Sequence, residues 1–375
     1  MIAPSSLDPQ RQGLAKEYAR IQRRLSFVEM GIFALILALF LLTGFSSALR
    51  NWIIVQFGGP YFIVIGLYGL VLGAIFFLIS LPLDFYSGYT LPTRYGLNTQ
   101  SVAGWVSDSV KSLVLTAVLG IAGLEVLYWL LGEFPTWWWV FMAALLWLFS
   151  AASLWLAPLL LMPLFYKIEP LNNPELVARL TRLAESAGAH VRGVYTMNMS
   201  SRTTTANAML AGLGSTRRII LGDTLLANYT EDEIETVLAH ELAHHVHNDL
   251  LWGLGFEAII IAVGMWFASV LLTWGVTAFG YSGVDDIASL PVFVAAMSLF
   301  GLLTMPLTNF LSRQRERAAD LYALKTTGNA PAFRSVMLKL AGQNLSEADP
   351  PAWVRNLFYS HPPISERIGV ADREP

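Results

Sequence analysis

Residues 230–280 read TEDEIETVLAHELAHHVHNDLLWGLGFEAIIIAVGMWFASVLLTWGVTAFG. The first part of this stretch is polar and holds four of the chain's six histidines, whereas residues 251–280 are almost entirely apolar. A helix needs about 20 apolar residues to cross the roughly 30 Å hydrocarbon core of a bilayer. The sequence therefore predicts a polar helix that is followed at once by a membrane span.

Apolar runs of similar length occur elsewhere in the 375-residue chain. Hydrophobic residues make up 55% of the sequence and charged residues only 14%, whereas a soluble domain has about 25% charged residues. The predicted spans are residues 27–49, 61–83, 110–132, 137–165, 251–280 and 289–311. We therefore predict a mainly α, polytopic membrane protein with about six transmembrane helices.

Lysine and arginine residues are unevenly distributed between the polar segments. They gather before the first span, in residues 166–250 and after residue 311, whereas the first loop holds only Arg50 and the third and fifth loops hold none. Short segments rich in these residues stay in the cytoplasm. We therefore expect both termini and residues 166–250 to be cytoplasmic.

Charge and cysteine content exclude several classes of function. The net charge of −3 gives no indication of nucleic-acid binding. The chain contains no cysteine, which excludes disulfides, thiolate metal ligands and thiol catalysis. Any metal ion must therefore be held by nitrogen and oxygen ligands.

The cytoplasmic segment carries the signals of a folded α+β module. Asn173 followed by a proline predicts the start of a helix, which a glycine at position 188 ends. Strands are predicted at 191–197, 203–210 and 217–222. The turn between the last two strands contains Gly212, Gly214 and Ser215. We expect these two strands to form a hairpin.

A helix is predicted from about residue 231 to 249. Thr230 and Glu233 have the spacing of a capping box, which satisfies the first free amide groups of a helix. Its apolar stripe consists of Ile234, Leu238 and Leu242. On roughly the opposite face lie His240, His244 and His247. Such a helix buries one face and presents imidazoles on another.

The sequence His240-Glu241-Leu242-Ala243-His244 has the form H-E-x-x-H. Side chains four apart lie on one face of a helix, so both imidazoles can bind one zinc ion at about 2.0–2.1 Å. Glu241 is turned by about 100° around the helix axis, from where it can take a proton from a water activated by the metal. We therefore predict a hydrolytic zinc site with Glu241 as the general base.

A catalytic zinc site needs a third protein ligand and an open position. The best candidate follows the last span, in the segment SRQRERAAD at 312–320, where Glu316 and Asp320 share one helix face. On its own this segment reads as an exposed helix with Glu316 paired to arginines. Because the segment lies on the same side of the membrane as His240, we predict that Glu316 is the third ligand and that Asp320 orients an imidazole.

These inferences predict four regions. Residues 1–165 hold the N-terminal tail and the first four spans, and residues 166–250 form the cytoplasmic catalytic module. Residues 251–312 hold the last two spans, and residues 313–375 form a C-terminal catalytic segment.

Several segments in this order resemble the type I CAAX prenyl proteases, a gluzincin-type family of integral-membrane zinc peptidases. The matching segments are RYGLNTQ at 94–100, Asn207-Ala208, RIILGDTLL at 218–226, the two metal motifs at 240–244 and 312–320, and His361-Pro362-Pro363 with Glu366-Arg367-Ile368. The resemblance extends over roughly residues 80 to 370. It is far more specific than any one of these motifs.

The resemblance implies roles that spacing does not show. Asn207 and Ala208 would belong to an edge strand that pairs with an extended peptide. His361 and Arg367 would face the active site, where His361 would stabilise the oxyanion of the tetrahedral intermediate. One zinc ion would be bound per chain. The substrate would be a membrane-associated protein, including lipidated chains, cleaved near its C-terminus, and membrane lipids would surround the enzyme.

Three other functions remain as alternatives. The eukaryotic members resemble this chain but are longer and have seven spans, which suggests a bacterial or archaeal relative in the cell membrane. In such a host, a quality-control protease for unfolded, unlipidated membrane proteins is the first alternative. A site-2 type intramembrane protease is disfavoured, because H-E-x-x-H here lies in a polar helix. A membrane scaffold with a structural zinc is disfavoured by the absence of cysteine.

Overall fold

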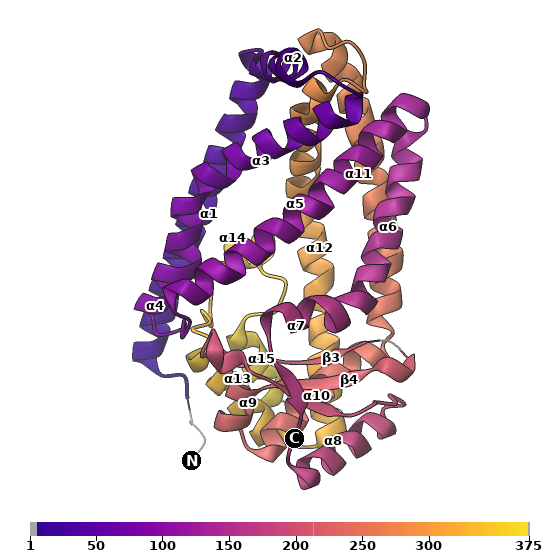
Figure 1. The fold of residues 1–375 in the computed structure, drawn as a ribbon. Coiled ribbons are helices and arrows are strands. Elements are labelled where there is room, and N and C mark those ends of the chain that lie inside the picture. The colour runs from indigo at the N-terminus through magenta and orange to yellow at the C-terminus, as the bar shows by residue number, and fades with distance from the viewer. Residues whose placement is uncertain (1–5, 213, 374–375) are drawn as a thin grey trace.

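The computed structural model describes residues 6–212 and 214–373, and long helices dominate it (Figure 1). Six helical segments in these residues are long and apolar enough to cross a membrane. The principal helices of these segments are α1 (Pro9–Leu42), α3 (Tyr61–Phe85), α5 (Val102–Glu133), α6 (Trp138–Leu156), α11 (Asp249–Phe279) and α12 (Leu290–Thr327). The predicted polytopic, mainly helical fold is confirmed.

The first span ends earlier than the predicted residue 49. Helix α1 stops at Leu42, and Gly44 adopts a left-handed conformation with φ 73°. Glycine has no Cβ and takes this conformation at little cost, so the chain can turn sharply there. A separate helix, α2 (Phe45–Phe57), then lies across the end of the bundle (Figure 1). The predicted span 27–49 is therefore wrong at its C-terminal end.

Two other spans are extended by a short π-helical segment. Helix α3 continues through η1 (Tyr86–Thr90) into α4 (Leu91–Arg94), and α6 continues through η2 (Ala157–Leu161) into α7 (Met162–Phe165). Proline cannot donate the backbone hydrogen bond of a regular helix. The second of these segments contains Pro158 and is followed by Pro163. These prolines account for the irregular end of the fourth span.

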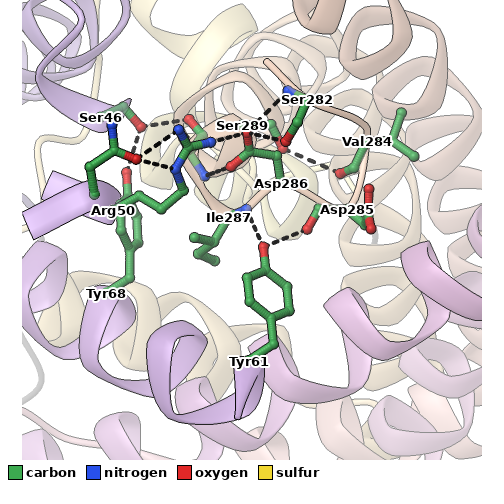
Figure 2. Close-up of polar contacts among 12 residues, drawn as sticks. Ser46, Arg50, Tyr61, Tyr68, Ser282, Val284, Asp285, Asp286, Ile287 and Ser289 are labelled. Carbon is green, nitrogen blue, oxygen red and sulfur yellow. Dashed lines mark hydrogen bonds and ion pairs between the residues drawn. The ribbon is translucent and has the colours of Figure 1, made fainter. Parts of the chain in front are cut away.

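A network of polar contacts closes the end of the bundle at α2 (Figure 2). Arg50 forms an ion pair with buried Asp286, just before η5 (Ile287–Ser289). The hydroxyl of Ser46 contacts that of Tyr68 at 2.6 Å and donates to the Ala288 carbonyl at 2.5 Å. These bonds connect α2, α3 and the segment that leads into α12. The buried side chains of Ser46, Tyr68 and Asp286 therefore have polar partners.

The opposite end of the bundle carries a four-stranded sheet (Figure 1). Its strands are β1 (Ile168–Pro170), β2 (Val194–Met197), β3 (Ala208–Ala211) and β4 (Arg218–Gly222), arranged in the order β1-β2-β4-β3. Strands β2 and β4 are parallel, and the other pairs are antiparallel. The hairpin of β3 and β4 is confirmed, and β3 lies at the edge of the sheet.

The strands differ from the prediction in two places. The short strand β1 was not predicted, because three residues give no periodic pattern. Residues 203–207 were assigned to a strand but form a loop: Thr204 donates from its amide to the Leu97 carbonyl at 3.0 Å, and Thr203 pairs with Asn98 in an isolated bridge. The segment around residues 94–100 therefore forms hydrogen bonds with the loop that leads into β3.

The remaining helices pack on the sheet or follow the sixth span. They are α8 (Pro174–Ser186), α9 (Asp223–Asn228), α10 (Glu231–Val246), α13 (Ala330–Gln343), α14 (Ala352–Phe358) and α15 (Ile364–Ala371), with the 3-10 turns η3 (Met199–Ser201) and η4 (Gly214–Thr216). As predicted, Asn173 caps α8, and Thr230 and Glu233 form a capping box on α10. The predicted end of α10 at residue 249 is wrong, because Asn248 is left-handed and starts a new helix, α11.

Candidate metal centre

Helix α10 presents its histidines because its other face is buried in the core below the sheet. Ile234, Leu238 and Leu242 are 2%, 1% and 0% exposed, in the same apolar cluster as residues of β4 and α13. This burial fixes the rotation of α10 about its axis. Its remaining face packs against α12, where His240 and His244 meet the part of α12 that continues beyond the sixth span.

Three side chains from these two helices converge. The Nε2 atom of His240 lies 3.2 Å from Oε2 of Glu316, and Nε2 of His244 lies 3.6 Å from Oε1 of the same carboxylate. The candidate ligand atoms of the three residues all lie within 4.8 Å of one another. Within the described part of the chain, this is the group suited to hold a metal ion.

The burial and the hydrogen bonding of the Glu316 carboxylate are consistent with metal binding. Glu316 is 7% exposed, and its buried Oε2 forms no hydrogen bond although His240 Nε2 is 3.2 Å away. Two ligand atoms on a tetrahedral zinc are about 3.3 Å apart. The pair therefore has the separation of two atoms directed at a shared cation. Two nitrogens and one oxygen also match the ligand types of a catalytic zinc site.

Asp320 lies behind the first imidazole. Its Oδ1 is 3.0 Å from Nδ1 of His240, and its two oxygens accept hydrogen bonds from Arg367 at 2.5 and 2.8 Å. Asp320 is 1% exposed and Arg367 is 9% exposed. A proton on Nδ1 of His240 is favoured by this carboxylate, which leaves Nε2 free to bind a metal.

Sequence reasoning missed the carboxylate that contacts the second imidazole. Asp249 Oδ2 forms a hydrogen bond of 2.9 Å with Nδ1 of His244, and Arg315 donates to Oδ1 of Asp249 at 2.9 Å. Asp249 is the first residue of α11. The spacing of five residues from His244 does not correspond to one face of a helix, so periodicity gave no signal for this contact.

Glu241 lies beside the metal group in a cavity of about 200 Å³. The lining of this cavity includes His240, Glu316, His361 and Arg367. Burial raises the pKa of the Glu241 carboxyl, and the nearby histidines oppose this rise. A carboxylate with a raised pKa is a stronger base.

The edge strand begins at the same cavity. Asn207 and Ala208 line it, and the Asn207 carbonyl accepts from the Gly222 amide at 2.9 Å. Asn344, which sequence reasoning also missed, holds the preceding residue: its Oδ1 accepts from the Ala206 amide at 2.9 Å, and its Nδ2 donates to the Ala206 carbonyl at 3.3 Å. Asn344 therefore holds the residue that leads into β3. The outer edge of β3 pairs with no other strand among the described residues.

His361 lies in the turn between α14 and α15, at the rim of the site. Its Nε2 is 3.5 Å from Oε1 of Glu316, and its side chain is 61% exposed. Arg313, which is buried in α12, donates to the carbonyls of Arg355 and Tyr359 at 3.0 and 2.5 Å. The arginine thereby connects the end of α14 to the helix that carries Glu316.

His247, the third histidine predicted on this face of α10, is not part of the group of three candidate ligands. Its ring packs against the ring of Tyr322.

Models of two protein families match the chain. The model described as peptidase family M48 matches residues 170–374. The model described as CAAX prenyl protease N-terminal, five membrane helices, matches residues 5–167. Together the two matches cover both the membrane helices and the candidate metal centre.

Individual proteins are similar over most of their length. An uncharacterized metalloprotease of Bacillus subtilis, YhfN, is 30% identical over 99% of this chain and 87% of its own length. CAAX prenyl protease 1 of Saccharomyces cerevisiae is 30% identical over 79% of this chain and 69% of its own length. The crystal structure of S. mikatae Ste24p has the same fold, with a TM-score of 0.88 and 24% identity over 99% of this chain and 92% of that one.

Proposed function

This chain belongs to peptidase family M48 as a membrane metalloprotease, and we propose that His240, His244 and Glu316 hold its catalytic zinc. The observation that carries this proposal is the buried Oε2 of Glu316, which has no hydrogen-bond partner and lies 3.2 Å from His240 Nε2. Burying a carboxylate oxygen without a partner is costly. A cation bound between these groups removes that cost.

The reaction is hydrolysis of a peptide bond, with Glu241 as general base and then general acid. A zinc ion bound here would lower the pKa of a water molecule to about 7 and polarise the peptide carbonyl. Glu241 accepts the proton of the attacking water and delivers it to the nitrogen of the leaving amine. Its position in the cavity beside the three proposed ligands supports this assignment.

Other residues around the metal group position the ligands or stabilise charge in the reaction. Asp320 orients His240, and Arg367 holds Asp320 through two hydrogen bonds. Arg367 also lines the cavity that contains Glu241. His361 donates to the oxyanion of the tetrahedral intermediate, an assignment supported by its place at the rim next to Glu316.

The substrate is an extended segment of a membrane-associated protein. Asn207 and Ala208 start the unpaired edge of β3, which would add the substrate as a further strand. The yeast relative is named a CAAX prenyl protease. We therefore assign prenylated C-terminal segments as the first substrate class to test. Preferential cleavage of unfolded, unlipidated membrane proteins would instead support a quality-control protease.

The catalytic module, residues 166–250, and the C-terminal segment, residues 313–375, face the cytoplasm in this proposal. The support is the distribution of lysine and arginine. These residues are frequent in the segments at this end of the bundle, whereas the loops at the other end hold only Arg50. The enzyme would then act on proteins at the inner face of a prokaryotic cell membrane.

Metal content tests the ligand set directly. We expect about one zinc per chain in the purified wild type and a large loss in His244→Ala and Glu316→Ala. His245→Ala is the matched control, because this neighbour on α10 contacts Arg217 and not Glu316. Zinc retained in Glu316→Ala would show that the third ligand lies elsewhere. A wild type that takes up no zinc would overturn the proposal.

A further inference from the structure

We propose that Asp249 is a positioning residue for the metal ligand His244, and that Arg315 holds Asp249 in place. The inference rests on the proposed function, because it takes His244 as a ligand. It is based on the Asp249 carboxylate, which contacts both His244 and Arg315. Oδ2 of Asp249 bonds to Nδ1 of His244 at 2.9 Å, and Oδ1 accepts from Arg315 at 2.9 Å.

The direction of the hydrogen bond follows from the other ring nitrogen. Nε2 of His244 faces Glu316 at 3.6 Å, on the side where the metal would bind. A metal-binding nitrogen carries no proton, so the proton resides on Nδ1 and is donated to Asp249. Such a carboxylate fixes the tautomer and the ring orientation and makes the imidazole a stronger ligand.

The break between α10 and α11 creates this contact. In an uninterrupted helix, residues five apart are turned by about 140° around the axis, so Asp249 would point away from His244. Asn248 instead adopts φ 54° and ψ 35°, a left-handed conformation that asparagine tolerates better than most residues. The chain changes direction there and brings Asp249 alongside His244.

Arg315 is itself held in place. Its guanidinium group lies over the ring of Trp252, 4.3 Å from the centroid. The Asp249 side chain is 12% exposed and that of Arg315 is 32% exposed, so the pair is partly shielded from solvent. Arg315 directly precedes Glu316 on α12. The arginine therefore couples the position of Asp249 to the helix that carries the third ligand.

Each of the two ligand imidazoles contacts an aspartate that is paired with an arginine. His240 faces Asp320, which is held by Arg367, and His244 faces Asp249, which is held by Arg315. Asp249 does not line the cavity that contains Glu241 but a second one, of about 430 Å³, that reaches Trp252 on α11. His244 and Glu316 also line this second cavity, and Asp249 contacts the metal group through its hydrogen bond with His244.

Zinc affinity provides the test. Asp249→Asn keeps the size of the side chain and removes its charge, and we expect the zinc dissociation constant to rise about 10- to 100-fold. The matched control is Asp286→Asn, which removes the charge from another aspartate paired with an arginine, at the far end of the bundle (Figure 2). Full-length purified protein is titrated against a chromogenic zinc chelator, beside His244→Ala.

The possible outcomes are distinct. Weaker zinc binding in Asp249→Asn together with wild-type affinity in Asp286→Asn supports the positioning role. Wild-type affinity in folded Asp249→Asn overturns it. Equal weakening in both variants also overturns it, because the effect would then be one of general stability. If Asp249→Asn does not fold, Arg315→Gln decides: a several-fold weaker affinity is expected, and an unchanged one rejects the proposal. A wild type without zinc refutes the proposed function itself.

Discussion

Substitution of Glu241 can test the catalytic step without removing a metal ligand. It lines the cavity but is not one of the three groups that converge on a cation position. In Glu241→Gln the amide cannot accept the proton of water, so we expect kcat to fall by about 10²- to 10⁴-fold. Zinc content should remain at the wild-type level. Peptide cleavage and elemental analysis of the same preparation measure both quantities.

Glu235→Gln is the control for that substitution. Glu235 lies on the same helix but forms its ion pair with Arg179 at the surface. Both variants lose one carboxylate from α10, and only one should lose activity. Near-normal cleavage by Glu241→Gln would mean that another group serves as the base.

At the scale of the elements, the position of β3 depends on the end of α13. Asn344 forms two hydrogen bonds with the backbone of Ala206. Each such bond contributes about 1 kcal/mol. We therefore expect Asn344→Ala to loosen the approach to β3 and to raise KM for extended peptides roughly tenfold. The zinc content should not change. Steady-state kinetics with peptides of increasing length measure the effect.

The other end of α13 offers a control. Asn329 caps the helix through a hydrogen bond to the Ala332 amide at 3.0 Å. Asn329→Ala should lower the stability of α13 by about 1 kcal/mol and leave KM unchanged. If both variants raise KM equally, β3 does not depend on the specific contact with Asn344.

At the scale of the whole molecule, α2 and the sheet lie at opposite ends of the bundle (Figure 1). The chain has no cysteine, so single cysteines can report which end is outside. We expect a membrane-impermeant maleimide to label Gln56→Cys in intact cells, because α2 would face outward. Glu175→Cys, at the start of α8, should react only after the membrane is permeabilised.

The unsubstituted chain provides the background for this labelling experiment, since it contains no thiol. Both variants must react in detergent, which shows that each cysteine is accessible. Labelling of Glu175→Cys in intact cells would place the catalytic module outside the cytoplasm. That result would reverse the proposed orientation without changing the fold.

The sequence by itself determined the membrane class, the helix that carries H-E-x-x-H and the groups suited to bind a metal. These features are local, because a membrane span is recognised by its length and hydropathy and α10 by its cap and apolar stripe. The segment with Glu316 was also found, since a helix that continues the sixth span must emerge on the side of residues 166–250.

Only the tertiary structure decided which distant groups support these residues. Asp249 reaches His244 because the left-handed Asn248 interrupts the helix, and periodicity describes only uninterrupted helices. Asn344 reaches Ala206 across 138 positions of sequence, and β3 becomes an edge strand through the order in which the sheet assembles. Such contacts depend on how helices and strands pack, which no local pattern encodes.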